Sequence, residues 1–241
     1  YDDVYQGYDV TYRHVEYAKG FKVERKLFDD DLYNIISRKP RNLAIAAART
    51  KEKCAATVFN DAFSGSGTIV VNGTTILNNS EGVSLCSGTH SSTAVATVQS
   101  NSGTTALSAT AVEATRILMA GYRDDRDNLI SVQPDLLLVP RALEETAWQI
   151  IATKGEVNSA DNNANFHYGK YKLAVWDYLS DSTNWFMIDS TMMKLYLNWY
   201  DRIPLEFNQD KSFDTFVAKY SVYGRWSYGW SGWQWLYGHN A

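Results

Sequence analysis

Histidine and cysteine are the side chains of this sequence with the greatest capacity to bind metal ions or to act as base and nucleophile. The chain carries four histidines and two cysteines, namely His14, His90, His167, His239, Cys54 and Cys86. No two histidines have the H-E-x-x-H spacing, and neither cysteine lies in a C-x-x-C pair. Cys86 and His90 could share a site, but two ligands do not complete a zinc centre. We therefore predict no metal ion and no cofactor, and we expect both thiols to be reduced, as in a cytosolic setting.

An asparagine-rich segment has part of the spacing of a calcium-binding loop. Asp161, Asn163 and Asn165 correspond to the first three ligand positions of such a loop. The loop needs Gly at its sixth position and a bidentate Glu at its twelfth, but these positions hold Phe166 and Lys172. The segment is therefore predicted to be a polar loop without a metal ion.

A glycine-rich fragment and the carboxylates are the remaining sources of chemistry. Gly65-Ser66-Gly67 begins like a nucleotide-binding motif, but no third Gly and no Lys-Ser/Thr pair follows, and the next segment has a strand pattern. No G-x-S-x-G nucleophile elbow occurs. Carboxylates are plentiful, so an acid–base pair assembled in three dimensions stays open, although nothing in the sequence favours one. The sequence therefore predicts a protein that is not an enzyme.

The charge and the aromatic content of the chain limit the kinds of partner that it could bind. The 241 residues have a formal net charge of −4, whereas a protein that grips phosphates needs an excess of basic residues. Direct, tight binding of nucleic acid is therefore not predicted. The chain also holds 16 Tyr, 9 Phe and 8 Trp, which fits either an aromatic core or large contact surfaces. Composition leaves these two alternatives open.

Neither a membrane-crossing segment nor a signal peptide is expected. No apolar run approaches the roughly 18 residues needed to cross a membrane, and no signal peptide is present. The chain begins at Tyr1 without Met, and we expect a further N-terminal segment before it.

The first third of the chain predicts an extended ribbon followed by a long helix. Apolar and polar residues alternate on both sides of Ala18-Lys19-Gly20, so residues 1–28 are predicted to form a β-hairpin that needs a surface to lie on. Asp29-Asp30-Asp31 is predicted to cap a short helix that ends at Pro40. A longer helix is predicted over 41–62, with an inward stripe at helical spacing formed by Leu43, Ala47, Thr50, Cys54 and Val58.

The rest of the chain mixes helices and strands without βαβ alternation or internal repeats. Residues 64–108 are rich in Ser, Thr, Gly and Asn and are predicted to be an elaborated loop region that includes a run at Thr68–Val71. Helices are expected from Thr110 to Gly121 and from Pro140 to Gly155. Strands are expected over 136–139, 171–176, 185–188, 194–200 and 217–226, with a loop over 204–214 and a Trp-rich tail over 228–237. This order predicts the α+β class.

A series of short motifs in a fixed order resembles the major capsid proteins of tailed phages. Each motif alone is weak, but together they cover nearly the whole chain. They are Gln6-Gly7-Tyr8, Gly20-Phe21-Lys22-Val23, Asp30-Asp31-Leu32-Tyr33, Thr50-Lys51-Glu52, Val58-Phe59-Asn60, Gly82–Ser87 with His90, Tyr122–Arg126, Leu138-Val139-Pro140, Leu143-Glu144, Asp177-Tyr178-Leu179, Asn184-Trp185-Phe186, Asp214-Thr215 and Gly229-Trp230 with Trp233.

The resemblance implies the Hong Kong 97-like capsid fold. Residues 1–28 would be the extended E-loop hairpin and 29–63 the peripheral domain with its long spine helix. Residues 64–193 would be the axial α/β domain, 194–225 the strands and loop that return to the peripheral domain, and 226–241 a C-terminal return segment. One departure is His90-Ser91, where relatives often carry His-Pro, so the loop over 91–107 is expected to differ in shape. No cross-linking lysine can be aligned.

The resemblance also implies a function and its partners. The chain would self-assemble as hexamers and pentamers into the icosahedral shell that encloses the double-stranded DNA genome, without sequence-specific DNA binding and without a membrane. Scaffolding, portal and decoration proteins would be further partners. The subunit would assemble in the bacterial host cytoplasm and end in the virion. Contact between subunits is predicted at Tyr8, Val10, Tyr12, Lys19, Phe21, Lys22, Arg49, Glu52, Arg202, Glu206 and Asp210.

Two other functions stay open at this stage. An encapsulin-like compartment would share the fold but would package enzymes. A carbohydrate-binding or hydrolytic protein would use the Trp-rich tail as a sugar platform, and it would behave as a monomer.

Overall fold

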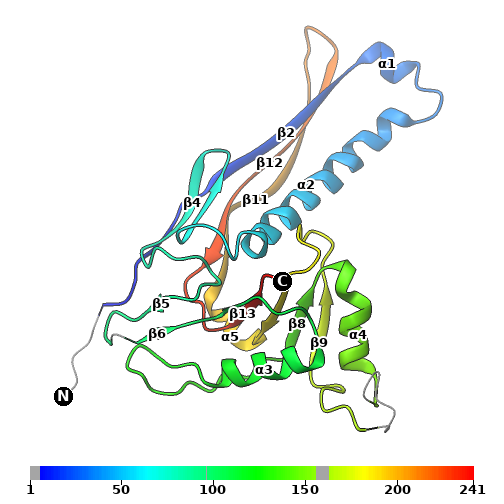
Figure 1. Ribbon diagram of the computed structural model, residues 1–241. Helices are drawn as coiled ribbons and strands as arrows, with labels where there is room; N and C mark the ends of the chain where they lie inside the picture. Colours follow the sequence, from blue (N-terminus) through cyan, green and yellow to red (C-terminus); the bar gives the residue numbers. More distant parts are fainter. Residues whose placement is uncertain (1–5, 96, 156–162) are drawn as a thin grey trace.

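The computed structural model describes residues 6–95, 97–155 and 163–241, which form a mixed α/β body and a long arm (Figure 1). The body holds most helices and a five-stranded sheet, and the arm consists of a three-stranded sheet beside one long helix. The predicted α+β class is confirmed by this arrangement.

The sheet of the arm is built from segments at opposite ends of the chain. Its strands are β2 (Val15–Glu24), β11 (Leu197–Lys211) and β12 (Val217–Trp230), in the order β11-β12-β2 with antiparallel pairing throughout. β11 and β12 form a long hairpin that begins inside the body and ends at the far end of the arm (Figure 1).

The predicted N-terminal hairpin is wrong. Residues 18–20 lie inside β2, which pairs along its whole length with β12, while β1 (Val10–Tyr12) pairs with a different strand. Gly20 suits this strand because a Cβ there would lie 2.9 Å from the carbonyl oxygen of Tyr220. Glycine therefore marks a close approach between strands here, and not a turn. A deletion of residues 8–22 would remove an edge strand of the arm and disturb the fold of the subunit. Loss of assembly in such a variant would therefore not show that these residues form a contact between subunits.

The long helix of the arm, α2, runs from Ile35 to Asn60. Asp31 caps it, since its carboxylate accepts hydrogen bonds from the backbone N–H groups of Ile35 and Ile36 at 3.0 and 2.7 Å. The predicted break at Pro40 is wrong, because the helix starts upstream and continues through this residue at the loss of one backbone hydrogen bond. The predicted stripe is confirmed at Leu43, Ala47, Cys54 and Val58, which are buried, and Thr50 is half-buried.

Two further expectations about the arm need correction. A short helix, α1 (Arg25–Asp29), stands where the second strand of the hairpin was expected to end. β11 extends through Pro204 to Lys211, so most of the loop expected over 204–214 is strand. An edge strand tolerates proline because one side of it has no partner, and the register is irregular between Ile203 and Glu206.

The body contains a mixed five-stranded sheet in the order β7-β13-β10-β8-β9. Its strands are β7 (Ser102–Gly103), β13 (Leu236–His239), β10 (Trp185–Ile188), β8 (Leu136–Val139) and β9 (Lys172–Val175). The expected strands at 136–139, 171–176 and 185–188 are thereby confirmed. β8 and β9 run parallel, whereas β10 runs antiparallel to both β8 and β13.

Helices pack around this sheet, and two small sheets complete the fold, of which the one that contains β1 and β4 contacts β12 of the arm. The helices are α3 (Ala109–Ala120), the 3₁₀ turn η1 (Arg141–Leu143), α4 (Glu144–Ala152) and α5 (Ser190–Tyr196). The cap of α3 is Ser108, not Thr110 as expected, and α5 was not expected at all. The small sheets pair β1 and β3 (Thr68–Val71) with β4 (Thr74–Asn79), and β5 (His90–Ser91) with β6 (Val98–Gln99).

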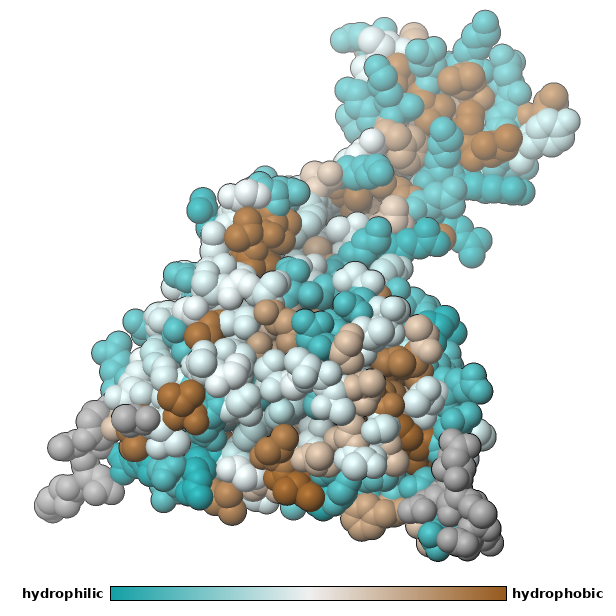
Figure 2. Space-filling model, in the orientation of Figure 1, coloured by the Kyte–Doolittle hydropathy of each residue, from teal (hydrophilic) through white to brown (hydrophobic). Residues whose placement is uncertain are grey.

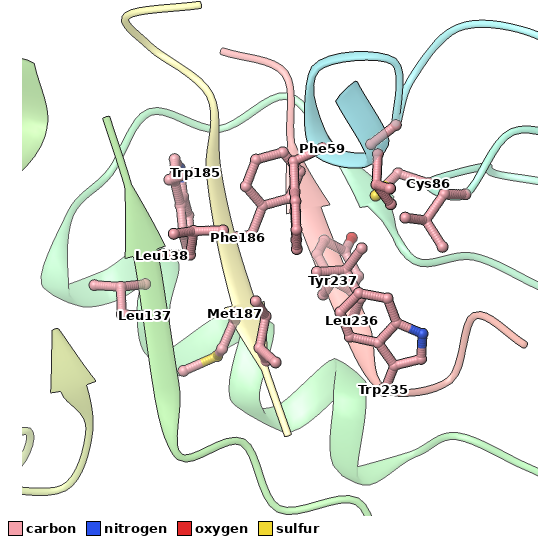
Figure 3. Packing of buried hydrophobic residues seen from close by; sticks show 14 of the residues in the cluster. Phe59, Cys86, Leu137, Leu138, Trp185, Phe186, Met187, Trp235, Leu236 and Tyr237 are labelled. Carbon is pink, nitrogen blue, oxygen red and sulfur yellow. The ribbon is translucent and has the colours of Figure 1, made fainter. Parts of the chain in front are cut away.

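Aromatic side chains fill the core where the arm meets the body. The ring of Phe59 on α2 lies 5.5 Å from that of Phe186 and 6.1 Å from that of Trp235, measured between centroids (Figure 3). Tyr17 of β2 stacks on Trp226 of β12 at 4.1 Å. The aromatic residues of the Trp-rich tail therefore belong largely to the core: Trp230, Trp233, Trp235 and Tyr237 are all buried.

The packing around β13 is so tight that one added methyl group is expected to destabilise the fold. A Cβ at Gly238 would lie 2.6 Å from Cys86 Sγ and 2.8 Å from the ring of Phe63. Gly238→Ala is therefore expected to lower the free energy of unfolding by about 1–3 kcal/mol, as measured by urea titration. Gly7→Ala is the matched control, since a Cβ there meets nothing within 4 Å. Equal stability of the two variants would contradict the packing described.

Candidate functional site

Among the described residues, one serine hydroxyl lies within hydrogen-bond distance of a histidine ring, that of Ser227 beside His14. The imidazole Nδ1 lies 3.0 Å from the hydroxyl oxygen, a distance suited to proton transfer. Ser227 is fully buried on β12, however, so a substrate has no path to its hydroxyl. This pair holds the N-terminal segment against the arm sheet.

His90 and Cys86 do not combine into a metal site. His90 Nδ1 lies 2.9 Å from a carboxylate oxygen of Glu81, and its Nε2 lies 3.0 Å from Oδ1 of Asn101. The imidazole also stacks on Trp233, with ring centroids 4.4 Å apart. Burial raises the pKa of the Cys86 thiol far above its usual range, which disfavours the metal-binding thiolate.

His239 lies at the centre of a buried hydrogen-bond chain. Its Nδ1 accepts from the backbone N–H of Thr105 at 3.2 Å, and its Nε2 lies 2.8 Å from the hydroxyl of Thr115. That hydroxyl donates to the carbonyl of Ala111 at 2.7 Å, so it must accept a hydrogen bond from Nε2–H. Burial lowers the pKa of His239 to about 4, and the ring stacks on Trp185. His239 is thus a neutral structural residue near the C-terminus.

No described group of three His, Cys, Asp or Glu side chains could hold a metal ion. Of the expected calcium-like spacing, Asp161 lies outside the described residues, and the side chain of Asn165 bonds the carbonyls of Ile150 and Thr153. Within the described ranges no helix is long and apolar enough to cross a membrane.

The most unusual surface lies at the far end of the arm. There α1, the segment before α2 and the β11–β12 turn bring large apolar side chains together in solvent (Figures 1 and 2). Leu32 is 87% exposed, Tyr33 74% and Phe213 89%. We call this surface the arm tip, and it comprises Leu27, Phe28, Leu32, Tyr33, Ile35, Phe213 and Phe216.

An exposed apolar cluster of this kind marks a contact surface. Arg25 adds a cation over the ring of Phe216, at 5.9 Å from its centroid. The described residues offer no element that covers the arm tip, because the arm ends there. None of these seven residues was predicted as a contact residue, although the predicted contact Asp210 lies in the same expected loop, 204–214, as Phe213. Apolar residues concentrated in a segment with many turn formers were the available signal.

The residues predicted to contact other subunits fall into two groups. Val10, Tyr12 and Phe21 are half-buried and pack within the chain: the Tyr12 ring lies 5.0 Å from Tyr200, and that of Phe21 lies 4.9 Å from Tyr220. The others have exposed side chains, and most of them lie along the arm. This exposed group comprises Tyr8, Lys19, Lys22, Arg49, Glu52, Arg202, Glu206 and Asp210.

Two members of the exposed group already have partners in the chain. The Tyr8 hydroxyl lies 2.7 Å from that of Ser91, and Glu52 accepts a hydrogen bond from the indole of Trp176 at 3.2 Å. The structure therefore does not bring the predicted residues together in one patch. They are spread along an extended surface.

Solved structures with a similar architecture include phage capsids. The chain is similar to the capsid protein of bacteriophage JBD30, with 11% identity and a TM-score of 0.55 over 69% of this chain and 75% of that one. It is also similar to Mycobacterium phage Che8 (13% identity, TM-score 0.53, 94% and 70%) and to the capsid of Myoviridae phage XM1 (12% identity, TM-score 0.54, 95% and 73%). No curated protein matches the chain.

These similarities show that the chain has the fold found in phage capsids. The family model described as "Phage capsid protein" matches residues 7–237. The chain belongs to this phage capsid protein family. The resemblance to phage major capsid proteins is confirmed, and the protein is a structural component of a phage virion.

Proposed function

We propose that this chain self-assembles through its arm and body into the closed icosahedral shell that encloses the double-stranded DNA genome of a tailed phage. The exposed arm tip is the observation that carries the proposal. Burying a Phe or Leu side chain contributes roughly 1.5–3 kcal/mol, and the arm tip holds several that only another molecule can bury. The proposal makes the subunit a structural protein with no enzymatic role.

The arm supports the division into peripheral and axial domains. α2 packs against β12 and β2, so residues 29–63 and 194–225 share one elongated unit, as a peripheral domain would. The five-stranded sheet with α3 and α4 forms the unit that corresponds to an axial domain. We retain the exposed residues Lys19, Lys22, Arg202, Glu206 and Asp210 as further contact candidates along the arm.

The charge of the chain supports enclosure of DNA without specific binding. With 23 basic and 27 acidic residues, the subunit has no electrostatic excess with which to grip phosphates. A shell needs only to surround the genome. Hexamers and pentamers, assembled in the host cytoplasm, are the form we propose, with portal, scaffolding and decoration proteins as partners.

Electron microscopy of the purified protein tests this function. We expect closed particles of uniform diameter together with free subunits in sedimentation velocity, and nuclease-protected DNA in particles from infected cells. A protein that stays monomeric at high concentration would overturn the proposal. Particles filled with protein cargo and free of DNA would favour a compartment of the encapsulin type instead.

The carbohydrate-binding alternative loses its structural basis. Its sugar platform required exposed indole rings in the tail, but Trp230, Trp233 and Trp235 are buried.

A further inference from the structure

The outer face of α4 carries a tryptophan that the described residues leave largely exposed. Trp148 is 56% exposed, and its indole N–H has no hydrogen bond within the described residues. Acidic side chains surround it. Glu144 is bonded to Arg141, but Glu145 has only a weak hydrogen bond from Gln149, at 3.4 Å. A large indole beside an uncompensated carboxylate is thus offered to solvent.

A hollow with the opposite charge lies elsewhere on the same body. It measures about 460 Å³ and is enclosed by the C-terminal half of α3, the segment 129–134 and residues 170–171. Leu129, Val132 and Pro134 give it apolar walls. Arg116 and Lys170 also line it, but Arg116 is paired with Glu113 at 2.6 Å, so Lys170 supplies the positive charge of the hollow. The ammonium group of Lys170 lies over the ring of Phe166 and has no ion pair among the described residues.

The wall of this hollow also includes Tyr171, which is buried. Its hydroxyl is enclosed and finds no partner among the described residues, so an occupant of the hollow packs against this wall without reaching that hydroxyl. A flat indole suits such a wall, because aromatic side chains bury a large apolar area at contacts between proteins.

We propose that Trp148 of one copy of this chain inserts into the hollow beside Leu129 and Tyr171 of the next copy. Glu145 then faces Lys170 across the contact. The hollow is large enough for an indole, its walls are apolar, and the charges at the two rims are opposite. The inference rests on the proposed shell function and specifies one contact within it.

The contact joins two different faces of the same body, so it is heterologous. Heterologous contacts between identical subunits close into rings when the rotation between neighbours permits. Repetition of this contact therefore makes rings of bodies, whereas the arm tips lie at the other end of the molecule (Figure 1). The two surfaces would have separate roles: one within a ring, and one between rings.

Cross-linking between two singly substituted proteins tests the contact directly. Glu145→Cys and Lys170→Cys, which keep Trp148 and the wall of the hollow, are prepared separately, mixed under assembly conditions and treated with a short bismaleimide. The native thiols, Cys54 and Cys86, are both buried and do not interfere. We expect a covalent dimer in the mixture, little or none in either variant alone, and a ladder up to closed rings in the double variant.

The failure of this contact can be distinguished from the failure of the proposed function. If wild-type shells form but the mixture gives no more dimer than the single variants, the inserted tryptophan is wrong and the shell function stands. If wild-type protein forms no shells at all, the proposed function fails first.

Charge reversal gives an independent readout. Glu145→Lys and Lys170→Glu are each expected to lower the yield of assembled particles at least tenfold, and the two together should restore most of it. Both side chains are exposed, so the subunits should remain folded by circular dichroism. Losses that simply add in the double variant would overturn the pairing.

Discussion

Phe213→Asp is expected to stop shell formation while leaving the subunit folded. Phe213 is 89% exposed in the turn between β11 and β12, so its replacement removes no contact inside the chain. In an assembled contact, the loss of one buried Phe and the burial of an unpaired carboxylate together weaken association by several kcal/mol. Each arm contact would then be weaker by on the order of a thousandfold.

Sedimentation velocity and electron microscopy measure this effect at equal protein concentration. The expected result is a monodisperse subunit with the wild-type circular dichroism spectrum and no particles. Val98→Asp is the matched control, because Val98 is 58% exposed on β6, far from the arm tip. Normal particles from Phe213→Asp would show that the arm tip is not an assembly surface.

Acidification is expected to destabilise the subunit through one buried histidine. The pKa of His239 is about 4 in the folded chain, against 6.5 for an unperturbed imidazole. The unfolded chain therefore binds a proton at a pH where the folded chain does not. The stabilisation is complete above pH 6.5, decreases as the pH falls, and is lost below about pH 4, with a total of about 3 kcal/mol.

The low pKa of His239 follows from its burial and from the tautomer that the ring adopts, in which Nε2 carries the proton and Nδ1 accepts a hydrogen bond. An added proton would go to Nδ1, which accepts the backbone N–H of Thr105, so protonation breaks that bond and buries a charge beside Trp185. No carboxylate contacts the ring among the described residues, hence nothing compensates the charge.

His239→Gln separates this effect from the titration of all other groups. Glutamine retains a donor and an acceptor but does not titrate. Between pH 7.5 and pH 5.0, urea unfolding should show the wild type losing about 2 kcal/mol more than the variant. His167, whose pKa burial also lowers, contributes equally to both proteins and cancels. Parallel pH profiles would refute the role of His239.

The sequence predicted those features well that depend on residues within one element. The apolar run at Leu136–Val139 in the body is one, and the stripe on α2 and the cap at Asp31 in the arm are two others. Such patterns reflect burial and hydrogen bonding that the neighbouring residues already determine.

The arm was predicted less well because its pairings join distant segments. The alternation in β2 is the same whether its partner is the preceding strand or β12, which lies about two hundred residues away. Nothing local to Gly20 separates a turn from a close approach to Tyr220. The arm tip was missed for a related reason, since exposure of Leu32 and Phe213 depends on where the arm ends in space.

The two register irregularities of β11 have a mechanical consequence. α2 and β12 each run as one element from the arm into the body. A force on the arm tip is therefore transmitted to the core and tends to bend the arm. β11 alone is interrupted, between Asp201 and Ile203 and between Ile203 and Glu206. The arm is therefore easiest to deform on the side of β11. We expect it to bend in one preferred plane and to resist bending in the plane at right angles to it.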